Sequence, residues 1–412
     1  MTDVIERYLI VNERERRHFL TTHKQAWKAL ATELSEPIGN YELSPMAIDV
    51  PTDRGGQTNR VLTFTYLYYI NLCLDQAIKK AKKSRTVRQH TVPNFRNRLF
   101  SQELPEDLVI NLYNGEFEIF PKGMPVSLQD SSDPSVSPIV VDNSLISIVN
   151  NIYDFTTDIK LPKKTVEEFF SSIETYAGQV FKNIQDGQFS LNVVDRIKIS
   201  VYVLAQYLRV TIRKNSFDQS AEEIFATLQD VLGSDVYPPR IPNTGTDNFG
   251  YIILELFDSL DLISNFFSRS WTWVEMPTGT LFTLRGLSYF DNDLSILFGG
   301  GLHNTKQLIL PVHPNLVLTM EQSNLGTPDK RIVATSELEK FINMMIVLSA
   351  GCEAETNSLY YRPDHSPIEN KTLWTPYLRD AYYYGLDYAI IANPKQRFAN
   401  QVFEVPSFFH KS

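Results

Sequence analysis

Apolar residues recur at steps of three and four along much of the chain, which is the spacing of one face of an α-helix. The clearest case starts at Thr165 and Glu168, a pair with the spacing of a capping box, and ends at Gly187, which favours a left-handed stop. The next segment, roughly 191–213, is apolar nearly all round. It predicts a helix buried on most sides, with a pair of strands as the alternative.

Further stretches share this helical period, so helix is expected to dominate the middle of the chain. They are a stripe of Leu20, Trp27, Leu30, Ala31 and Leu34 on one helix, residues 61–78, a helix capped by Ser220 with Glu223 and closed at Gly233, residues 249–267, and a helix capped by Ser336 with Glu339 and closed at Gly351.

Alternating apolar and polar residues predict strands in two regions. In the first, residues 109–120, the dipeptide Asn114-Gly115 is the preferred two-residue turn of a β-hairpin. The segment that follows, 121–142, is rich in Pro and Ser and indicates an exposed loop.

The second β region lies between helical blocks. Residues 271–284 are expected to form another hairpin, and residues 306–320 two short strands broken at Pro314. The predicted fold class is therefore mainly α within the α+β class, a helix-rich body with β-hairpins inserted.

Positive charge is concentrated in one segment of an acidic chain. The 412 residues carry 39 Lys and Arg against 48 Asp and Glu, a net charge of −9. No carboxylate lies between Asp75 and Glu103, and removing the eight cations found there leaves 31 against 48, a net charge of −17 on the rest. These cations are Lys79, Lys80, Lys82, Lys83, Arg85, Arg88, Arg96 and Arg98.

The basic segment has two parts. Its four lysines would extend a helix end into solvent, where cations interact favourably with the helix dipole. The arginines continue past that end along a path that Pro93 keeps extended, so they could follow a phosphate backbone without reading its sequence. We expect an RNA contact, with an acidic partner surface or a solvated face as the alternatives.

Motifs for catalysis or metal binding are missing from the sequence. There is no GxSxG, HExxH or GxxxxGK[ST] motif, and the seven histidines are scattered. Asp291 with Asp293 is better explained as a turn, and Cys73 as a small buried side chain. We therefore predict a protein that is not an enzyme and that has no catalytic residue, metal or cofactor. With two cysteines and no apolar leader, a soluble protein of a reducing compartment is expected.

The C-terminal segment is dense in aromatic residues and ends in an arm that Pro406 keeps extended. Such an arm suits docking on a neighbouring subunit, although packing on its own domain is the alternative. The subunit-interface candidates are Trp374, Tyr377, Tyr382, Tyr383, Tyr384, Phe403, Phe408 and Phe409.

By its length, element order, basic segment and aromatic arm, the chain resembles the capsid proteins of partitiviruses, double-stranded RNA viruses of plants and fungi, and among them the plant cryptic virus type. The resemblance implies dimers that assemble into an icosahedral shell around double-stranded RNA and the viral polymerase. It also implies a virion or host-cytoplasm location, without a membrane. In these terms 1–108, 144–270 and 336–412 form the helical shell domain and arm, 109–143 is a hairpin with an exposed loop, and 271–335 is a β-rich protrusion.

A second likeness competes with the first. The segment RQHTVPNFRNRLF, followed much later by LPVHPNLVLTM, is similar to an uncharacterised bacterial family that opens with a His-x-Val-Pro-x-Phe pattern. That likeness implies a nucleic-acid-related enzyme or defence protein in which His90 and His313 share a site.

Overall fold

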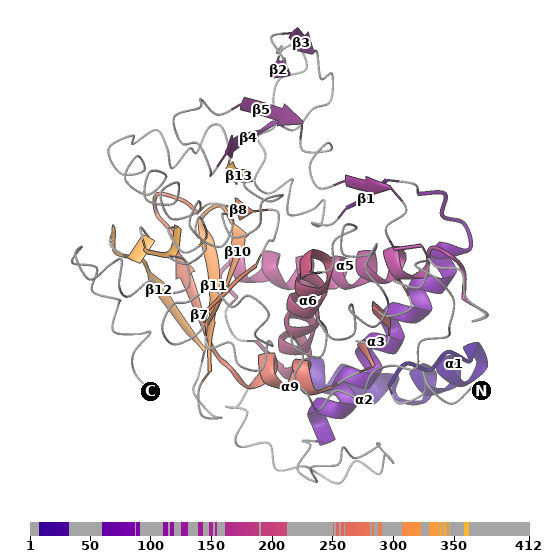
Figure 1. Ribbon diagram of the computed structural model, residues 1–412. Coiled ribbons are helices and arrows are strands. Elements are labelled where there is room, and N and C mark those ends of the chain that lie inside the picture. Colours follow the sequence, from indigo (N-terminus) through magenta and orange to yellow (C-terminus); the bar gives the residue numbers. More distant parts are fainter. Residues whose placement is uncertain are drawn as a thin grey trace.

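A computed structural model gives the architecture of the protein (Figure 1). It describes residues 8–32, 60–86, 161–188, 191–211, 260–280, 307–322 and 329–336, together with short stretches between 88 and 361.

The described helices gather on the N-terminal side of the molecule (Figure 1). At their centre α3 packs against both α5 and α6, and α6 packs in turn against α9. Their bounds are α1 (Glu13–Thr22), α2 (Lys24–Thr32), α3 (Arg60–Ala81), α5 (Thr165–Gln185), α6 (Val193–Thr211) and α9 (Asp261–Ser268).

Helices α5 and α6 confirm two sequence predictions and correct one detail. The segment at 191–213 is a helix rather than a strand pair, and Gly187 ends α5 with a φ of 94°. Thr165 does not form the predicted capping box, because it is the first helical residue and its hydroxyl donates to the carbonyl of Pro162 at 2.6 Å. The spacing of the two side chains was right, but the helix begins one residue too early for Thr165 to cap it.

The N-terminal stripe lies on two helices, not on one. Helix α1 starts at Asn12, whose side chain accepts hydrogen bonds from the amides of Arg14 and Glu15, and it ends at His23. Leu20 therefore belongs to α1, whereas Trp27, Leu30 and Ala31 belong to α2. Leu34 lies outside the described residues.

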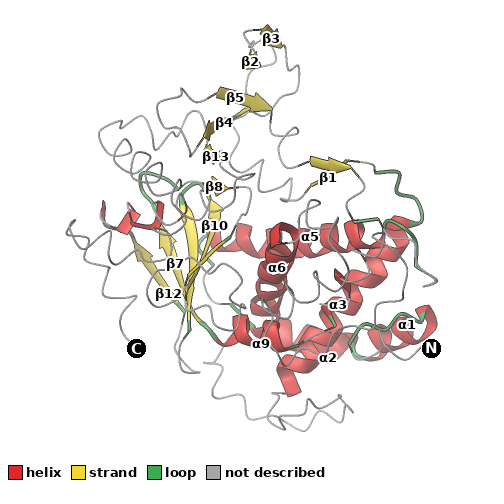
Figure 2. Ribbon diagram, in the orientation of Figure 1, coloured by secondary structure: helices red, strands yellow, loops and turns green. Residues whose placement is uncertain are grey.

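A five-stranded sheet lies beside the helices (Figure 2). Its order is β12-β7-β11-β10-β9, antiparallel except that β12 runs parallel to β7. The strands are β7 (Ser270–Glu275), β9 (Ser288–Phe290), β10 (Gln307–His313), β11 (Leu316–Glu321) and β12 (Lys330–Val333). Buried side chains of β7, β10 and β11 join the helices in one hydrophobic core.

This sheet confirms two predicted strands and shows that a predicted hairpin was wrong. Strands β10 and β11 are the two strands expected at 306–320, broken at Pro314, and the structure shows in addition that they pair with each other. The hairpin expected at 271–284 does not form, since β7 pairs with β11 and β12 while β8 (Phe282–Thr283) pairs with β13 (Ser358–Tyr361). Local alternation had identified the strands but not their partners.

Short strands occupy most of the described part of the chain between 88 and 150. The hairpin at Asn114-Gly115 is confirmed, since its strands β2 and β3 pair. Residues 121–142 were wrongly expected to be a loop, because β4 and β5 lie within them and pair in a four-stranded sheet of order β5-β4-β13-β8. The bounds are β1 (Arg88–His90), β2 (Ile110–Tyr113), β3 (Glu116–Glu118), β4 (Pro125–Asp130), β5 (Ile139–Asp142) and β6 (Ile148–Asn150).

The fold is helix-rich and of the α+β class, as the sequence predicted. In the part of the chain that the structure describes, no helix has the length and apolarity needed to cross a bilayer. The predicted helix at 220–233 lies outside the described residues. The predicted cap at Ser336 is wrong by one residue, because the hydroxyl oxygen of Thr335 accepts the amide of Leu338.

Candidate functional site

The C-terminal end of α3 lies beside the start of α1, and both carry cations. The Nζ atom of Lys82 is 3.6 Å from the carboxylate of Glu13, and Arg17 Nε is 4.0 Å from Asp75. This pairing across the two helices brings residues about 65 positions apart in sequence onto one surface. In Figure 1 the end of α3 continues from here toward β1.

Asp75 joins α1 to α3 beneath this surface. It is buried, and its carboxylate pairs with Lys79 one helical turn later and with Arg16 Nε at 3.5 Å. The Arg16 side chain is 0% exposed and donates to the carbonyls of Ile10 and Val11, at 2.9 and 3.0 Å. Burial lowers the pKa of Arg16, and the charge of Asp75 opposes that shift. Arg16 is thus a structural cation that ties the N-terminal segment to α3.

The remaining cations point outward. We define the α1–α3 basic surface as Arg14, Arg17, Lys79, Lys80, Lys82, Lys83 and Arg85, all of them exposed. Among the described residues, three carboxylates accompany them, those of Glu13, Glu15 and Asp75. In the same part of the chain, Lys80, Lys83 and Arg85 form no ion pair. None of these three cations is held by a described carboxylate.

The sequence found the α3 part of this surface and missed the α1 part. Arg14 and Arg17 lie in the run NERERRHF, where Glu13 and Glu15 balance them in sequence. No local signal distinguishes such a run from an ordinary solvated helix. Only the packing of α1 on α3 adds its arginines to the lysines.

The rest of the predicted basic segment is described only in part. Arg88 lies in β1, which pairs antiparallel with β6, so the expected extended path past the helix end is confirmed there as a strand. Arg96 and Arg98 lie outside the described residues, as do the eight aromatic candidates for a subunit interface.

The two histidines of the second likeness belong to different sheets. His90 lies opposite Ile148 in the β1–β6 pair, whereas His313 ends β10 of the five-stranded sheet, where its Nδ1 accepts the amide of Asn315 at 3.3 Å. Cys73 is buried in α3, and burial raises the pKa of its thiol, as expected of a packed side chain rather than a nucleophile.

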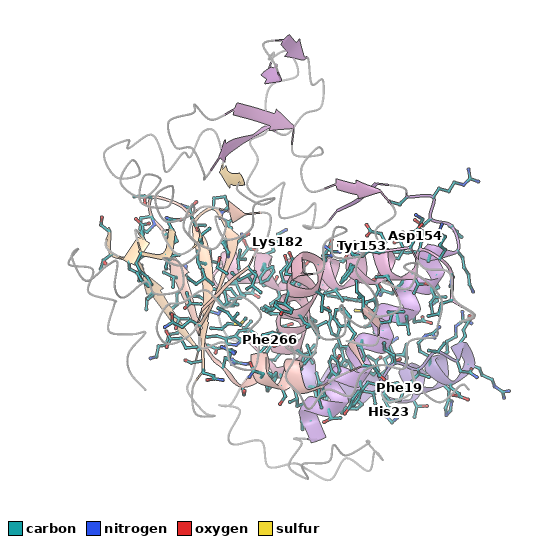
Figure 3. The ribbon with its side chains drawn as sticks, in the orientation of Figure 1. Phe19, His23, Tyr153, Asp154, Lys182 and Phe266 are labelled. Carbon is teal, nitrogen blue, oxygen red and sulfur yellow. The ribbon has the colours of Figure 1, made fainter. Side chains whose placement is uncertain are left out.

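A second charged cluster, missed from the sequence, lies between α5 and α6. Arg209 on α6 is 2% exposed, forms an ion pair with Glu174 on α5, and places its guanidinium carbon 4.1 Å from the ring centroid of Phe170. The same guanidinium carbon lies 5.9 Å from the ring centroid of Tyr153. Figure 3 shows Tyr153 beside Asp154, toward the end of α5 that lies away from Lys182. We call Arg209, Glu174, Glu167 and Tyr153 the Arg209 cluster.

Burial shifts the acidic groups of this cluster. It raises the pKa of Glu167 to about 8, although the charge of Arg209 opposes the shift. Burial also raises the pKa of Glu174, again against Arg209. The pKa of Arg209 is raised because Glu174, Tyr153 and Glu167 together outweigh the lowering that burial causes. Within the described residues, no group of three or more His, Cys, Asp or Glu side chains could hold a metal ion.

Comparison with known families gives one match. Residues 88–235, about a third of the chain, match a family described as a protein of unknown function (DUF4238). The match begins at Arg88, at the start of the segment that carries the His-x-Val-Pro-x-Phe pattern, and it includes Tyr153, α5 and α6. No curated protein and no solved structure matches the chain.

Proposed function

We propose that the protein binds the phosphate backbone of nucleic acid through the α1–α3 basic surface. The observation that carries the proposal is the exposure of Lys80, Lys83 and Arg85 without an ion pair to any residue that the structure describes, on a chain whose net charge is −9. Such a cluster of cations on an acidic protein attracts a polyanion locally.

The geometry favours backbone contact over base recognition. The surface is built from long lysine and arginine side chains around a helix C-terminus, the negative end of the helix dipole, which repels phosphate. Contact must therefore come from side-chain charges, which interact with any phosphate and carry no sequence information. We expect similar affinities for duplexes of different sequence.

The family match lies next to the basic surface in sequence, and the family's function is unknown, so the match itself does not identify the ligand. The matched residues start three positions after Arg85, so the basic surface leads directly into the matched segment. Because the structure places His90 and His313 in separate sheets, we do not assign them a shared site. The proposal does not include an enzymatic activity.

The coat-protein hypothesis stays a prediction with its own test. It requires dimers, an icosahedral shell around double-stranded RNA, and a protruding β module, and its interface residues lie outside the described part of the chain. Multi-angle light scattering of the purified chain decides it. Particles of many subunits would support a capsid, and a monodisperse monomer at all salt concentrations would contradict it.

Neutralising the three unpaired cations is expected to weaken binding strongly. In the triple variant Lys80→Gln, Lys83→Gln, Arg85→Gln, the affinity for a short RNA duplex should fall about 10- to 100-fold at low salt. The slope of log K against log salt should become shallower by about 2 to 3, since each lost phosphate contact removes about 0.9. Fluorescence anisotropy over a salt series measures both quantities.

A matched control separates local contact from net charge. The variant Lys24→Gln, Lys182→Gln, Lys330→Gln removes three exposed cations away from the basic surface. It should keep the affinity and the slope of the unchanged protein. Equal losses in the two triple variants would show that only overall charge matters and would contradict the proposed site.

A further inference from the structure

The Arg209 cluster holds two carboxylates and one cation. Glu174 forms an ion pair with Arg209, and its side chain is only 18% exposed. Glu167, two helical turns earlier on α5, interacts with the same guanidinium, and its Oε2 atom is buried without a hydrogen-bond partner among the described residues. With both carboxylates ionised, the cluster would hold one uncompensated negative charge away from water, which is strongly unfavourable.

Neighbouring cations oppose this excess without removing it. Lys164, just before α5, shares the carboxylate of Asp154 with Lys163, at 2.8 and 3.3 Å, and Lys80 on α3 is exposed. The charge of Lys164 lowers the pKa of Glu167 and that of Lys80 lowers the pKa of Glu174, but burial outweighs both. Glu168, on the same helix, adds a further negative charge that raises the pKa of Glu167. The groups facing Glu167 and Glu174 from α3, α5, α6 and the segment before α5 therefore leave the negative excess in place.

A buried amide lies next to the cluster. Tyr202, Gln206 and Arg209 are spaced four and three residues apart, so they form one stripe on α6. Tyr202 packs on Phe181 of α5 and Arg209 pairs with α5 as well, so the stripe faces that helix. Gln206 between them is 0% exposed, and both of its amide atoms are buried without a hydrogen-bond partner in the described part of the chain. Buried amides are rarely left in this state, which indicates a polar occupant such as water.

We infer that α5 and α6 enclose a proton-binding site in which Glu167 and Glu174 hold one proton between them near neutral pH, beside the amide of Gln206. One proton neutralises the excess charge, and the protonated carboxyl becomes a donor for the polar groups around it. Glu167 and Glu174 interact electrostatically with each other and with the same guanidinium, and carboxylates coupled in this way titrate as a pair, of which one member can stay protonated. The raised pKa of Glu167, about 8, agrees with this reading.

The site lies beneath the segment that opens the family match. Tyr153 contacts Arg209 and follows β6 by three residues, and β6 pairs with β1 at His90. Loss of the proton would add a negative charge where the chain passes from β6 into α5. The inference concerns these residues alone and does not depend on nucleic-acid binding.

Infrared difference spectroscopy on the full chain tests the inference. Because burial also raises the pKa of Glu321, to about 7, every measurement uses the Glu321→Gln background. The carbonyl stretch of a protonated carboxylic acid should be present at mildly acidic pH and fade through pH about 8. Adding Glu167→Gln should abolish that band. Glu168→Gln, one residue further along α5, should keep the band at mildly acidic pH and let it fade at a lower pH, because the charge of Glu168 contributes to the raised pKa of Glu167.

Each outcome decides the question. A missing band, or a band that survives in Glu167→Gln, would overturn the proton-binding site. If Glu167→Gln fails to fold, Glu174→Gln replaces it: with one carboxylate left beside Arg209, that carboxylate should ionise and the band should disappear. A band that persists in Glu174→Gln would show that no proton is shared.

Discussion

Replacing Arg196 with alanine is expected to lower the free energy of unfolding by about 3–5 kcal/mol, the range for removing one partner from a buried charged network. The side chain is buried and its Nε donates to the carbonyl of Phe267 at 2.7 Å. One terminal nitrogen pairs with Asp329 at 2.5 Å, and the other donates to the carbonyl of Arg269. The guanidinium carbon also lies 4.1 Å from the ring centroid of Trp271.

The effect is large because Arg196 links the two layers of the fold. It belongs to α6, whereas its partners belong to the end of α9, the start of β7 and the residue before β12. Without it, two carbonyls and the carboxylate of Asp329 lose their partner inside the protein. Chemical unfolding followed by circular dichroism measures the loss.

The control for this variant lies on the same helix. Lys198 pairs with Asp195 at 2.7 Å on a partly exposed face, so Lys198→Ala should cost less than about 1 kcal/mol. A loss in Arg196→Ala as small as that in Lys198→Ala would mean that Arg196 does not join helix and sheet.

Replacing Arg209 with alanine is expected to destabilise the protein in a pH-dependent way. At alkaline pH both Glu174 and Glu167 would be ionised without a cation, so the loss should approach about 3–5 kcal/mol. At pH about 5 the loss should be smaller, since carboxyls whose folded-state pKa is raised take up protons on folding. The stability that these carboxyls contribute is fully present at a pH below their unfolded-state pKa. It is lost as the pH rises through their folded-state pKa.

Unfolding curves at the two pH values measure this difference. Adding Glu174→Gln to Arg209→Ala should recover part of the stability at alkaline pH, because it removes one of the two unpaired charges. An equal loss at both pH values, without recovery in the double variant, would show that Arg209 contributes by packing on Phe170 rather than by charge.

Periodicity predicted the elements that depend on local pattern. The helices α3, α5 and α6 and the strands β10 and β11 follow from apolar spacing and from Pro314, all of which are local features. Strand partners were harder, because β7 pairs with β11 and β12 through contacts that lie about 40 to 60 residues apart. Alternation within 271–284 contains no information about such partners.

The candidate sites show the same limit. The lysines of α3 were found because they follow one another in sequence. The arginines of α1 were missed because only tertiary packing brings them there. Glu167, Glu174 and Arg209 were also missed, since each looks like an ordinary surface residue of an amphipathic helix until the burial of α5 against α6 is known.

Hydrogen exchange with and without a saturating RNA duplex tests the nucleic-acid contact most directly. The account predicts slower exchange at the start of α1 and at residues 79–86, with no change in β7, β10 and β11. Protection confined to the five-stranded sheet, or no protection anywhere, would contradict the proposed basic surface.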